Sequence, residues 1–371
     1  MIVIGGGIAG LAAAWELLRS GATVTVLERS LCGQEASWAG AGILSPLLPW
    51  DYPEAVTRLT QFSAHLFPRF VEALQAETGV DAEYQTSGML VLPDSSSQAC
   101  VEPETFAKCS RMLLAKRWCA RHAIPVQEVQ SSQMAPSLRR DTAALWLPEV
   151  CQVRNPRLLQ ALIKAVKALG GKVIEHARVA GWKIEREYVQ SVSTVAGERH
   201  SAGQYVVAAG AWSRRLLAEH AAALEVWPVR GQILLFKMRP GLLDPIVLDE
   251  RDNFYLIPRR DGHILAGSTL EEAGFDKSTT HEARKTLLAR AQALIPVLAE
   301  GTIAAHWAGL RPASPRNIPA ISVHPAISNL YLNSGHYRYG VTMAPGSAQL
   351  IANMILGKLQ PLDVTPYQWP V

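Results

Sequence analysis

A glycine-rich turn between two short apolar segments restricts the possible fold of this chain more than any other feature. Residues 2–4 (Ile-Val-Ile) are typical of a buried strand, and apolar residues then recur from Ile8 to Leu18 at helical spacing. Residues 23–27 alternate and include β-branched side chains, which predicts a second strand. The pattern therefore predicts a βαβ unit with parallel strands and a right-handed crossover.

The turn itself, Gly5-Gly6-Gly7-Ile8-Ala9-Gly10, fits the pattern G-x-G-x-x-G. Gly5 permits the tight turn, Gly7 lets the backbone approach a pyrophosphate, and Gly10 lets the helix pack closely on the strand. The free N–H groups and the dipole at the start of the helix favour phosphate there. Glu28 closes the second strand, where a carboxylate can accept hydrogen bonds from ribose hydroxyls. We predict a dinucleotide site, with a purely structural turn as the alternative.

Two further stretches of small residues bear on which dinucleotide binds. Residues 37–43 (Ser-Trp-Ala-Gly-Ala-Gly-Ile) let the backbone pass close to a bulky ring system, or form a flexible loop. Residues 208–213 follow a buried strand, and they either close over the pyrophosphate or begin a helix with Ser213 as its N-cap. Arg29 lies next to Glu28, so a nicotinamide phosphate cofactor is an alternative to FAD at this point.

Along the rest of the chain, the balance of predicted helices and strands changes. Helices are predicted over 53–77, 157–169, 282–295 and 344–356, strands over 172–176, 205–209 and 329–333, and a loop over 93–104. Between 231 and 268 strands dominate, with candidates at 232–236, 254–258 and 263–267. A strand-rich block between βαβ-like segments predicts a second, largely antiparallel unit.

Composition sets limits on the class of protein. The chain has 371 residues, of which 49% are hydrophobic and 18% charged, so two globular domains are expected. A net charge of +4 is too small to indicate a nucleic acid or a membrane surface as partner, and no apolar run is long enough to span a bilayer. The arginine pairs at 139–140, 214–215 and 259–260 are predicted to lie on a solvated face, with an anionic ligand as the alternative.

The cysteines and the first residues bear on the compartment. The 5 cysteines lack C-x-x-C spacing, which predicts reduced thiols and no metal site. Residues 1–4 run directly into glycines, so the apolar start is predicted to be a strand and not a signal peptide. We therefore expect a cytoplasmic protein.

Several motifs together resemble the D-amino-acid oxidase superfamily, and within it the glycine oxidase branch of thiamine biosynthesis. They are residues 4–10 with Glu28, residues 36–43, residues 209–213, Trp307-Ala308-Gly309-Leu310-Arg311-Pro312, and Gly335-His336-Tyr337-Arg338-Tyr339-Gly340-Val341. The resemblance runs nearly end to end, and the last two motifs are the most specific.

The resemblance implies an α/β fold with two domains. A Rossmann-type FAD-binding domain would comprise residues 1–78, 146–222 and 306–371. A substrate domain with a largely antiparallel sheet would comprise 79–145 and 223–305. It also implies FAD as cofactor, a small amino acid and O2 as partners, and a homo-oligomer. The FAD would be non-covalent, because the family's covalent branch uses a late cysteine and none follows Cys151.

Site residues follow from the same resemblance. The substrate carboxylate would be held by Arg338 and Arg311, helped by Tyr255. Near the pocket, Asn253 and Leu270 would replace a histidine and a methionine of the glycine oxidase pattern. FAD would contact three groups of residues: Gly5, Gly7, Ile8, Ala9, Gly10 and Gly210 at the pyrophosphate; Glu28, Arg29 and Val179 at the adenosine; and Ala36, Ser37, Ala41, Gly42, Ile43, His336, Tyr337, Arg338, Tyr339, Gly340, Val341 and Thr342 at the flavin.

The chemistry of the family suits these residue types. Hydride transfer from Cα to a flavin needs an oriented substrate, and a planar guanidinium holds a carboxylate bidentately. His336 is expected to be structural and not a general base, and the start of the helix near Ala344 would direct its dipole at the flavin.

The predicted reaction converts glycine, O2 and water into glyoxylate, ammonia and hydrogen peroxide, through an imine that is hydrolysed or passed to thiazole synthesis. The alternatives are an oxidase or dehydrogenase for sarcosine, a small D-amino acid or another secondary amine, and a flavoprotein without catalytic activity.

Overall fold

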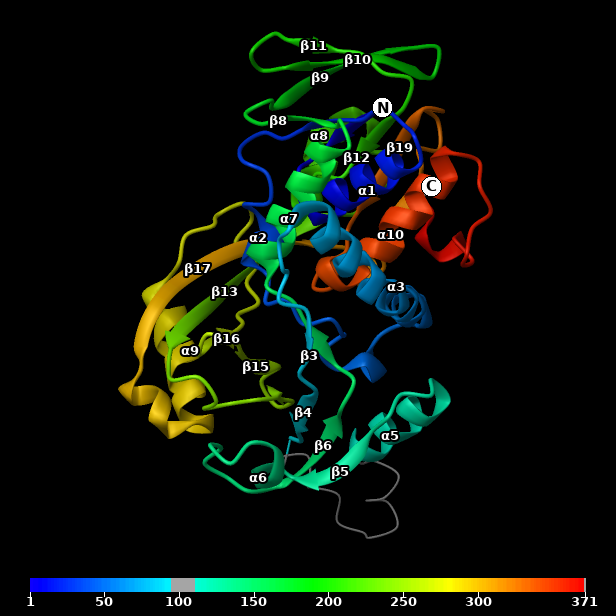
Figure 1. Cartoon of the computed structure of the whole chain (residues 1–371). Helices are drawn as coiled ribbons and strands as arrows, with labels where there is room; N and C mark the ends of the chain where they lie inside the picture. Colours follow the sequence, from blue (N-terminus) through cyan, green and yellow to red (C-terminus); the bar gives the residue numbers. More distant parts are fainter. Residues whose placement is uncertain (95–110, 370–371) are drawn as a thin grey trace.

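The described chain forms two large sheets, with a three-stranded and a two-stranded sheet beside them (Figure 1). The computed structural model describes residues 1–94 and 111–369. Most of the loop predicted over 93–104 lies outside the described residues. Within the described part, no helix is both long and apolar enough to cross a bilayer.

The first sheet has six strands in the order β18-β19-β12-β1-β2-β8. β1 pairs in parallel with both β2 and β12, as the βαβ prediction requires, and β18 alone runs antiparallel to its neighbour. The carboxyl ends of β1, β12 and β19 meet at one edge, so the turns that follow them converge there. The strands are β1 (Ile2–Ile4), β2 (Thr25–Leu27), β8 (Lys172–Ile174), β12 (Tyr205–Val207), β18 (Ala320–Val323) and β19 (Leu330–Ser334).

Four helices pack on one another beside this sheet, namely α1 (Ile8–Arg19), α3 (Glu54–Thr78), α7 (Asn155–Ala168) and α10 (Gly340–Ile355). Val3 and Val26 point into the same apolar core as α1, because side chains alternate across a strand. Ile2 and Ile4 point to the opposite face, where they meet a three-stranded meander. This meander, β9 (Val179–Glu185), β10 (Tyr188–Thr194) and β11 (Arg199–His200), was not predicted.

The second sheet has eight strands in the order β17-β13-β16-β15-β14-β4-β6-β5. Its pairs are antiparallel except β4 with β14, so the prediction of a largely antiparallel sheet is confirmed. β15 (Phe254–Pro258) and β16 (His263–Gly267) have the predicted limits. The other strands are β4 (Met89–Leu92), β5 (Gln127–Gln130), β6 (Ala143–Leu147), β13 (Trp227–Lys237), β14 (Ile246–Asp249) and β17 (Thr302–Ala313).

Both faces of the second sheet are buried. Along β4, Met89 and Val91 enter one apolar core, and Leu90 and Leu92 enter the other. The latter core also contains apolar residues of α9 (His281–Leu294), whose N-cap Thr280 accepts a 3.2 Å hydrogen bond from the Ala283 N–H.

β13 and β17 connect the two sheets. They pair along their whole length, with Gly231 opposite Gly309, and Figure 1 shows them curving from the first sheet toward the second. Near Gly309 the strand β17 packs on α2 (Ala36–Ala39) and on the turn η3 (Gly210–Trp212). The predicted domain boundary at 305/306 falls inside β17, and the domain ranges stay a prediction.

Several short elements complete the described chain. They are η1 (Pro49–Asp51), β3 (Gln85–Thr86), α5 (Arg111–Arg121), α6 (Ser131–Met134), β7 (Cys151–Gln152), α8 (Ser213–Leu217), η4 (Ala218–Ala221), η5 (Pro296–Glu300), η6 (Pro315–Asn317) and η7 (Thr365–Tyr367).

Candidate active site

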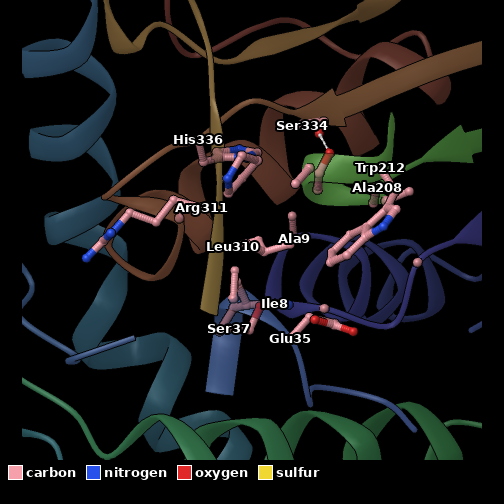
Figure 2. Close-up of a pocket in the computed structure, with 18 of the residues that line it drawn as sticks. Ile8, Ala9, Glu35, Ser37, Ala208, Trp212, Leu310, Arg311, Ser334 and His336 are labelled. Atoms are coloured by element: carbon pink, nitrogen blue, oxygen red, sulfur yellow. Dashed lines mark hydrogen bonds between the residues drawn. The ribbon is translucent and has the colours of Figure 1, made fainter. Parts of the chain in front are cut away.

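A cavity of about 1180 Å³ lies where the turns after β1, β12 and β19 converge, and β13 and β17 close its far end. Figure 2 shows Arg311 and His336 on one side of this cavity and Trp212 on the opposite side, with Ile8 and Ala9 between them. All the residues predicted to bind cofactor or substrate line it except Gly10 and Thr342.

The glycine turn packs with no space for side chains at Gly5 and Gly10. A Cβ on Gly10 would lie 1.9 Å from the Gly5 carbonyl oxygen, and a Cβ on Gly5, whose φ is +116°, would lie 2.4 Å from the Ala208 carbonyl oxygen. Gly10 therefore acts through close packing beneath the cavity. Ile8, the first residue of α1, donates its N–H to the Ser37 hydroxyl at 2.9 Å.

Glu28 follows β2, lies beside this turn and is 7% exposed. Its carboxylate accepts hydrogen bonds from the Gly6 N–H at 2.8 Å and the Ser30 N–H at 3.0 Å. The neighbouring Arg29 pairs with Glu35 and stacks on the Trp212 ring at 3.6 Å. Trp212 belongs to the motif at residues 209–213 but was not predicted to be a site residue.

A buried arginine from the second sheet fixes the loop that holds residues 36–43. Arg259 donates to the Gln152 side chain at 2.6 Å, the Val153 carbonyl at 2.9 Å and the Ala41 carbonyl at 2.7 Å. Burial lowers its pKa to about 10. The prediction of a solvated face at 259–260 is wrong for Arg259, because backbone and amide oxygens distant in sequence converge on it.

Arg215 is exposed, as predicted for this pair, and it also lines the cavity. Its guanidinium lies 5.7 Å from the Phe275 ring, and Phe275 packs on Trp212 with ring centroids 5.5 Å apart. Lys277 from the same segment pairs with Glu35 at 2.9 Å. The segment between β16 and α9 therefore contacts the part of the cavity lined by Trp212 and Glu35, which the sequence pattern did not indicate.

The C-terminal helix α10 begins at Gly340 and not at the predicted Ala344, so its first turn lines the cavity. Thr342, the third residue of α10, does not line the cavity. Its hydroxyl donates to the Ile43 carbonyl at 3.1 Å, which holds the helix against the 36–43 loop. His336 precedes the helix and is 3% exposed. Burial lowers the pKa of His336 to about 4, so its ring is neutral at neutral pH.

Two arginines reach the end of the cavity that faces the second sheet. Arg311 on β17 donates to the Ser268 hydroxyl at 2.6 Å and the Thr269 carbonyl at 3.1 Å. Burial lowers the pKa of Arg311. Burial also disfavours the Arg338 cation, but the phenols of Tyr339, Tyr52 and Tyr255 outweigh that effect and raise its pKa. Within the described residues no carboxylate pairs with either guanidinium.

Two predicted neighbours of the pocket do not line it. Asn253 occupies the turn between β14 and β15 with a φ of +49°, and Leu270 is 50% exposed.

The fold and the site define a dinucleotide-dependent enzyme in which Arg311 of the second sheet and Arg338, which follows β19 of the first sheet, lie at the far end of the cofactor cavity. A family model described as FAD dependent oxidoreductase (DAO) matches residues 1–354, and the chain belongs to this family. The predictions of an FAD-dependent oxidoreductase and of a mixed α/β fold are confirmed.

Individual relatives show which members of the family this chain is similar to. The chain is 40% identical to a glycine oxidase of Pseudomonas aeruginosa over 373 residues, which covers 99% of this chain and 97% of the relative. It is 33% identical to a bifunctional protein ThiO/ThiG of Synechocystis, covering 98% of this chain and 52% of that protein. The crystal structure of glycine oxidase from Geobacillus kaustophilus superimposes with a TM-score of 0.91 at 26% identity, covering 100% of this chain and 97% of that one. The predicted similarity to glycine oxidases is therefore confirmed.

Proposed function

We propose that the protein oxidises glycine to glyoxylate and ammonia, reducing O2 to hydrogen peroxide, and that sarcosine and small D-amino acids are further substrates. The observation that carries the proposal is the pair Arg311 and Arg338, two partly buried cations that face one cavity without a carboxylate partner among the described residues. A buried charge without a counter-ion is costly, so an anionic ligand is expected to complete the site.

FAD is proposed as a non-covalent cofactor. The cavity extends from the glycine turn to Arg338, and no cysteine is among its lining residues. His336 Nε2 and Asn333 Oδ1 are buried, belong to lining residues and have no hydrogen-bond partner in the described chain, which fits a polar ligand. When bound, the flavin supplies the acceptor for the hydride that leaves the substrate Cα. Acid precipitation tests the non-covalent link: the flavin should appear in the supernatant, and flavin retained in the pellet would overturn it.

The chain's own residues would orient the substrate. Arg338 and Arg311 would hold the carboxylate, with Tyr255 beside them, and the N–H groups at the start of α10 would favour negative charge on the adjacent part of the ligand. His336 contributes no charge at neutral pH, because burial holds its pKa near 4. It is therefore not proposed as an acid, and no base is proposed because hydride transfer from Cα to the flavin needs none.

The imine product is proposed to be hydrolysed or passed to thiazole formation in thiamine biosynthesis. The likeness to a bifunctional protein ThiO/ThiG supports the second route, since this chain matches about half of that protein. A cytoplasmic location and a homo-oligomer stay predictions, and light scattering on the purified protein tests the second.

The competing functions are a dehydrogenase with another electron acceptor and a flavoprotein without catalysis. Hydrogen peroxide release from glycine, sarcosine, D-alanine and ethylamine separates them. The proposal expects peroxide from glycine and little from ethylamine, which has no carboxylate. Flavin reduction by glycine without peroxide would indicate the dehydrogenase. A flavin that no amine reduces would indicate the flavoprotein without catalysis.

A further inference from the structure

Arg311 reaches the cavity by crossing the neighbouring strand. Its position on β17 pairs with Val229, and its guanidinium lies diagonally over Gly231 of β13. A Cβ on Gly231 would lie 1.9 Å from Arg311 Nη1 and 2.3 Å from Cζ. The missing side chain at Gly231 therefore makes the space that the guanidinium occupies.

Beyond β13, the guanidinium is held by the two residues that follow β16. Nη2 donates to the Ser268 hydroxyl at 2.6 Å and Nη1 donates to the Thr269 carbonyl at 3.1 Å. Ser268 is buried and lines the cavity. Both acceptors are neutral, so they fix the direction of the guanidinium and leave its positive charge available.

The Thr269 carbonyl is itself fixed by a polar network beneath the cavity. The Thr269 hydroxyl donates to Glu271 and accepts a 2.9 Å hydrogen bond from the Gln232 N–H. Glu271 accepts from Arg230 at 2.6 Å and from the Gln232 side chain at 2.9 Å. Glu271 is thus paired with Arg230. The cross-strand partner of Arg230 on β17 is Leu310, the residue before Arg311. Glu271 therefore does not neutralise Arg311.

From these contacts we propose that Ser268 is a positioning residue for carboxylate binding, which holds Arg311 toward the substrate with a neutral acceptor. The inference rests on the proposed function, because it takes the ligand of Arg311 to be the substrate carboxylate. A hydroxyl orients the guanidinium, whereas a carboxylate at the same position would form an ion pair and compete with the substrate.

Three substitutions in the holoenzyme separate orientation from charge. Ser268→Ala removes the acceptor, Ser268→Thr keeps a hydroxyl, and Ser268→Asp keeps an acceptor but adds a negative charge. The matched control is Ser328→Ala, which removes an exposed hydroxyl that donates to the Glu187 carbonyl at 3.3 Å, outside the cavity.

Two measurements are made on each protein. The dissociation constant of acetate, followed by the change in flavin absorbance, reports carboxylate binding without turnover. Steady-state KM and kcat are then measured for glycine, and kcat/KM for ethylamine. Loss of one hydrogen bond to a charged group predicts a rise of roughly 10-fold in the acetate Kd and the glycine KM for Ser268→Ala. Ser268→Asp should raise both by roughly 100-fold or more, because the charge of Arg311 is then neutralised.

For Ser268→Thr and Ser328→Ala, the proposal expects an acetate Kd and a glycine KM near those of wild type. In every variant it expects unchanged FAD content and an unchanged kcat/KM for ethylamine. An acetate Kd for Ser268→Ala within twofold of wild type would overturn it. So would a fall in ethylamine oxidation equal to that for glycine, because that result indicates general damage to the site. If wild type binds acetate but does not oxidise glycine, the proposed function fails while the acetate constants still decide the role of Ser268.

Discussion

The guanidinium of Arg259 donates a 2.7 Å hydrogen bond to the carbonyl oxygen of Ala41, although the two residues are 218 positions apart in the chain. Arg259 directly follows β15 of the second sheet, and Ala41 lies in the loop proposed to pass the flavin. The same guanidinium binds Gln152 and Val153, which flank that loop. One buried side chain therefore fixes a loop of the cofactor cavity to the second sheet.

The first prediction concerns this contact. Arg259→Leu leaves three buried oxygens without their donor and should lower the free energy of unfolding by about 2–4 kcal/mol. FAD content should fall as well, because the loop loses its anchor. Arg260→Leu is the matched control, since Arg260 is 47% exposed and its ion pair with Asp81 should contribute less than about 1 kcal/mol. Thermal unfolding and bound flavin measure both effects, and equal losses in the two variants would contradict this account.

Gly7→Val should abolish FAD binding and leave most of the fold intact. A Cβ on Gly7 would have the Ser37 hydroxyl 3.2 Å away as its nearest neighbour, and that side chain can move, whereas a pyrophosphate against the backbone cannot. Gly203→Val is the control, because no atom lies within 4 Å of a Cβ there. The measurement is FAD bound per chain, with circular dichroism for the fold. Full occupancy in Gly7→Val would make the motif structural.

The buried ring of His336 predicts a pH dependence of stability. Its pKa falls from 6.5 to about 4 on burial, so the unfolded chain takes up a proton at a higher pH than the folded chain. The contribution of His336 therefore destabilises the fold increasingly as the pH falls from 6.5 to about 4, by about 3 kcal/mol in all, and is absent above that window.

His336→Gln removes this titration and should flatten the acid side of the stability profile. Thermal unfolding between pH 7.5 and pH 4.5 is the measurement, with the exposed His65→Gln as control. A His336→Gln profile parallel to that of wild type would contradict a pKa of His336 lowered by burial.

The sequence pattern predicted what depends on neighbours along the chain. The glycine turn, the βαβ unit, β15 and β16 follow from periodicity and turn residues over short windows. The contacts of Arg259 could not be predicted in this way, because its three acceptors come from residues more than 100 positions away. The same holds for Ser268, which resembles any serine after a strand until β17 brings Arg311 beside it.

Two elements differ from the prediction. The helix α10 begins four residues early, at Gly340, and continues through Pro345. The meander β9–β11 was missed because much of its surface is exposed, so only the few residues facing the core, such as Val189 and Val192, are apolar by necessity.

Arg338→Ala should lower kcat/KM for glycine by about 30- to 4,000-fold, because removing one partner of a buried charge pair costs about 2–5 kcal/mol. Arg338 has no hydrogen bond to the described part of the chain, so the substrate is its expected partner. FAD content should stay normal, Arg338→Lys should rescue only in part, and ethylamine should be oxidised equally poorly by all three proteins. If Arg338→Ala kept the kcat/KM of wild type for glycine, Arg311 would be the principal carboxylate ligand.

The central claim is that glycine reduces a flavin bound in this cavity. Anaerobic mixing of the purified holoenzyme with glycine tests it most directly, with the visible absorbance of the flavin as the readout. The account predicts that the absorbance is lost with glycine in wild type, and far more slowly in Arg338→Ala. An oxidised flavin that persists with glycine, sarcosine and D-alanine alike would contradict it.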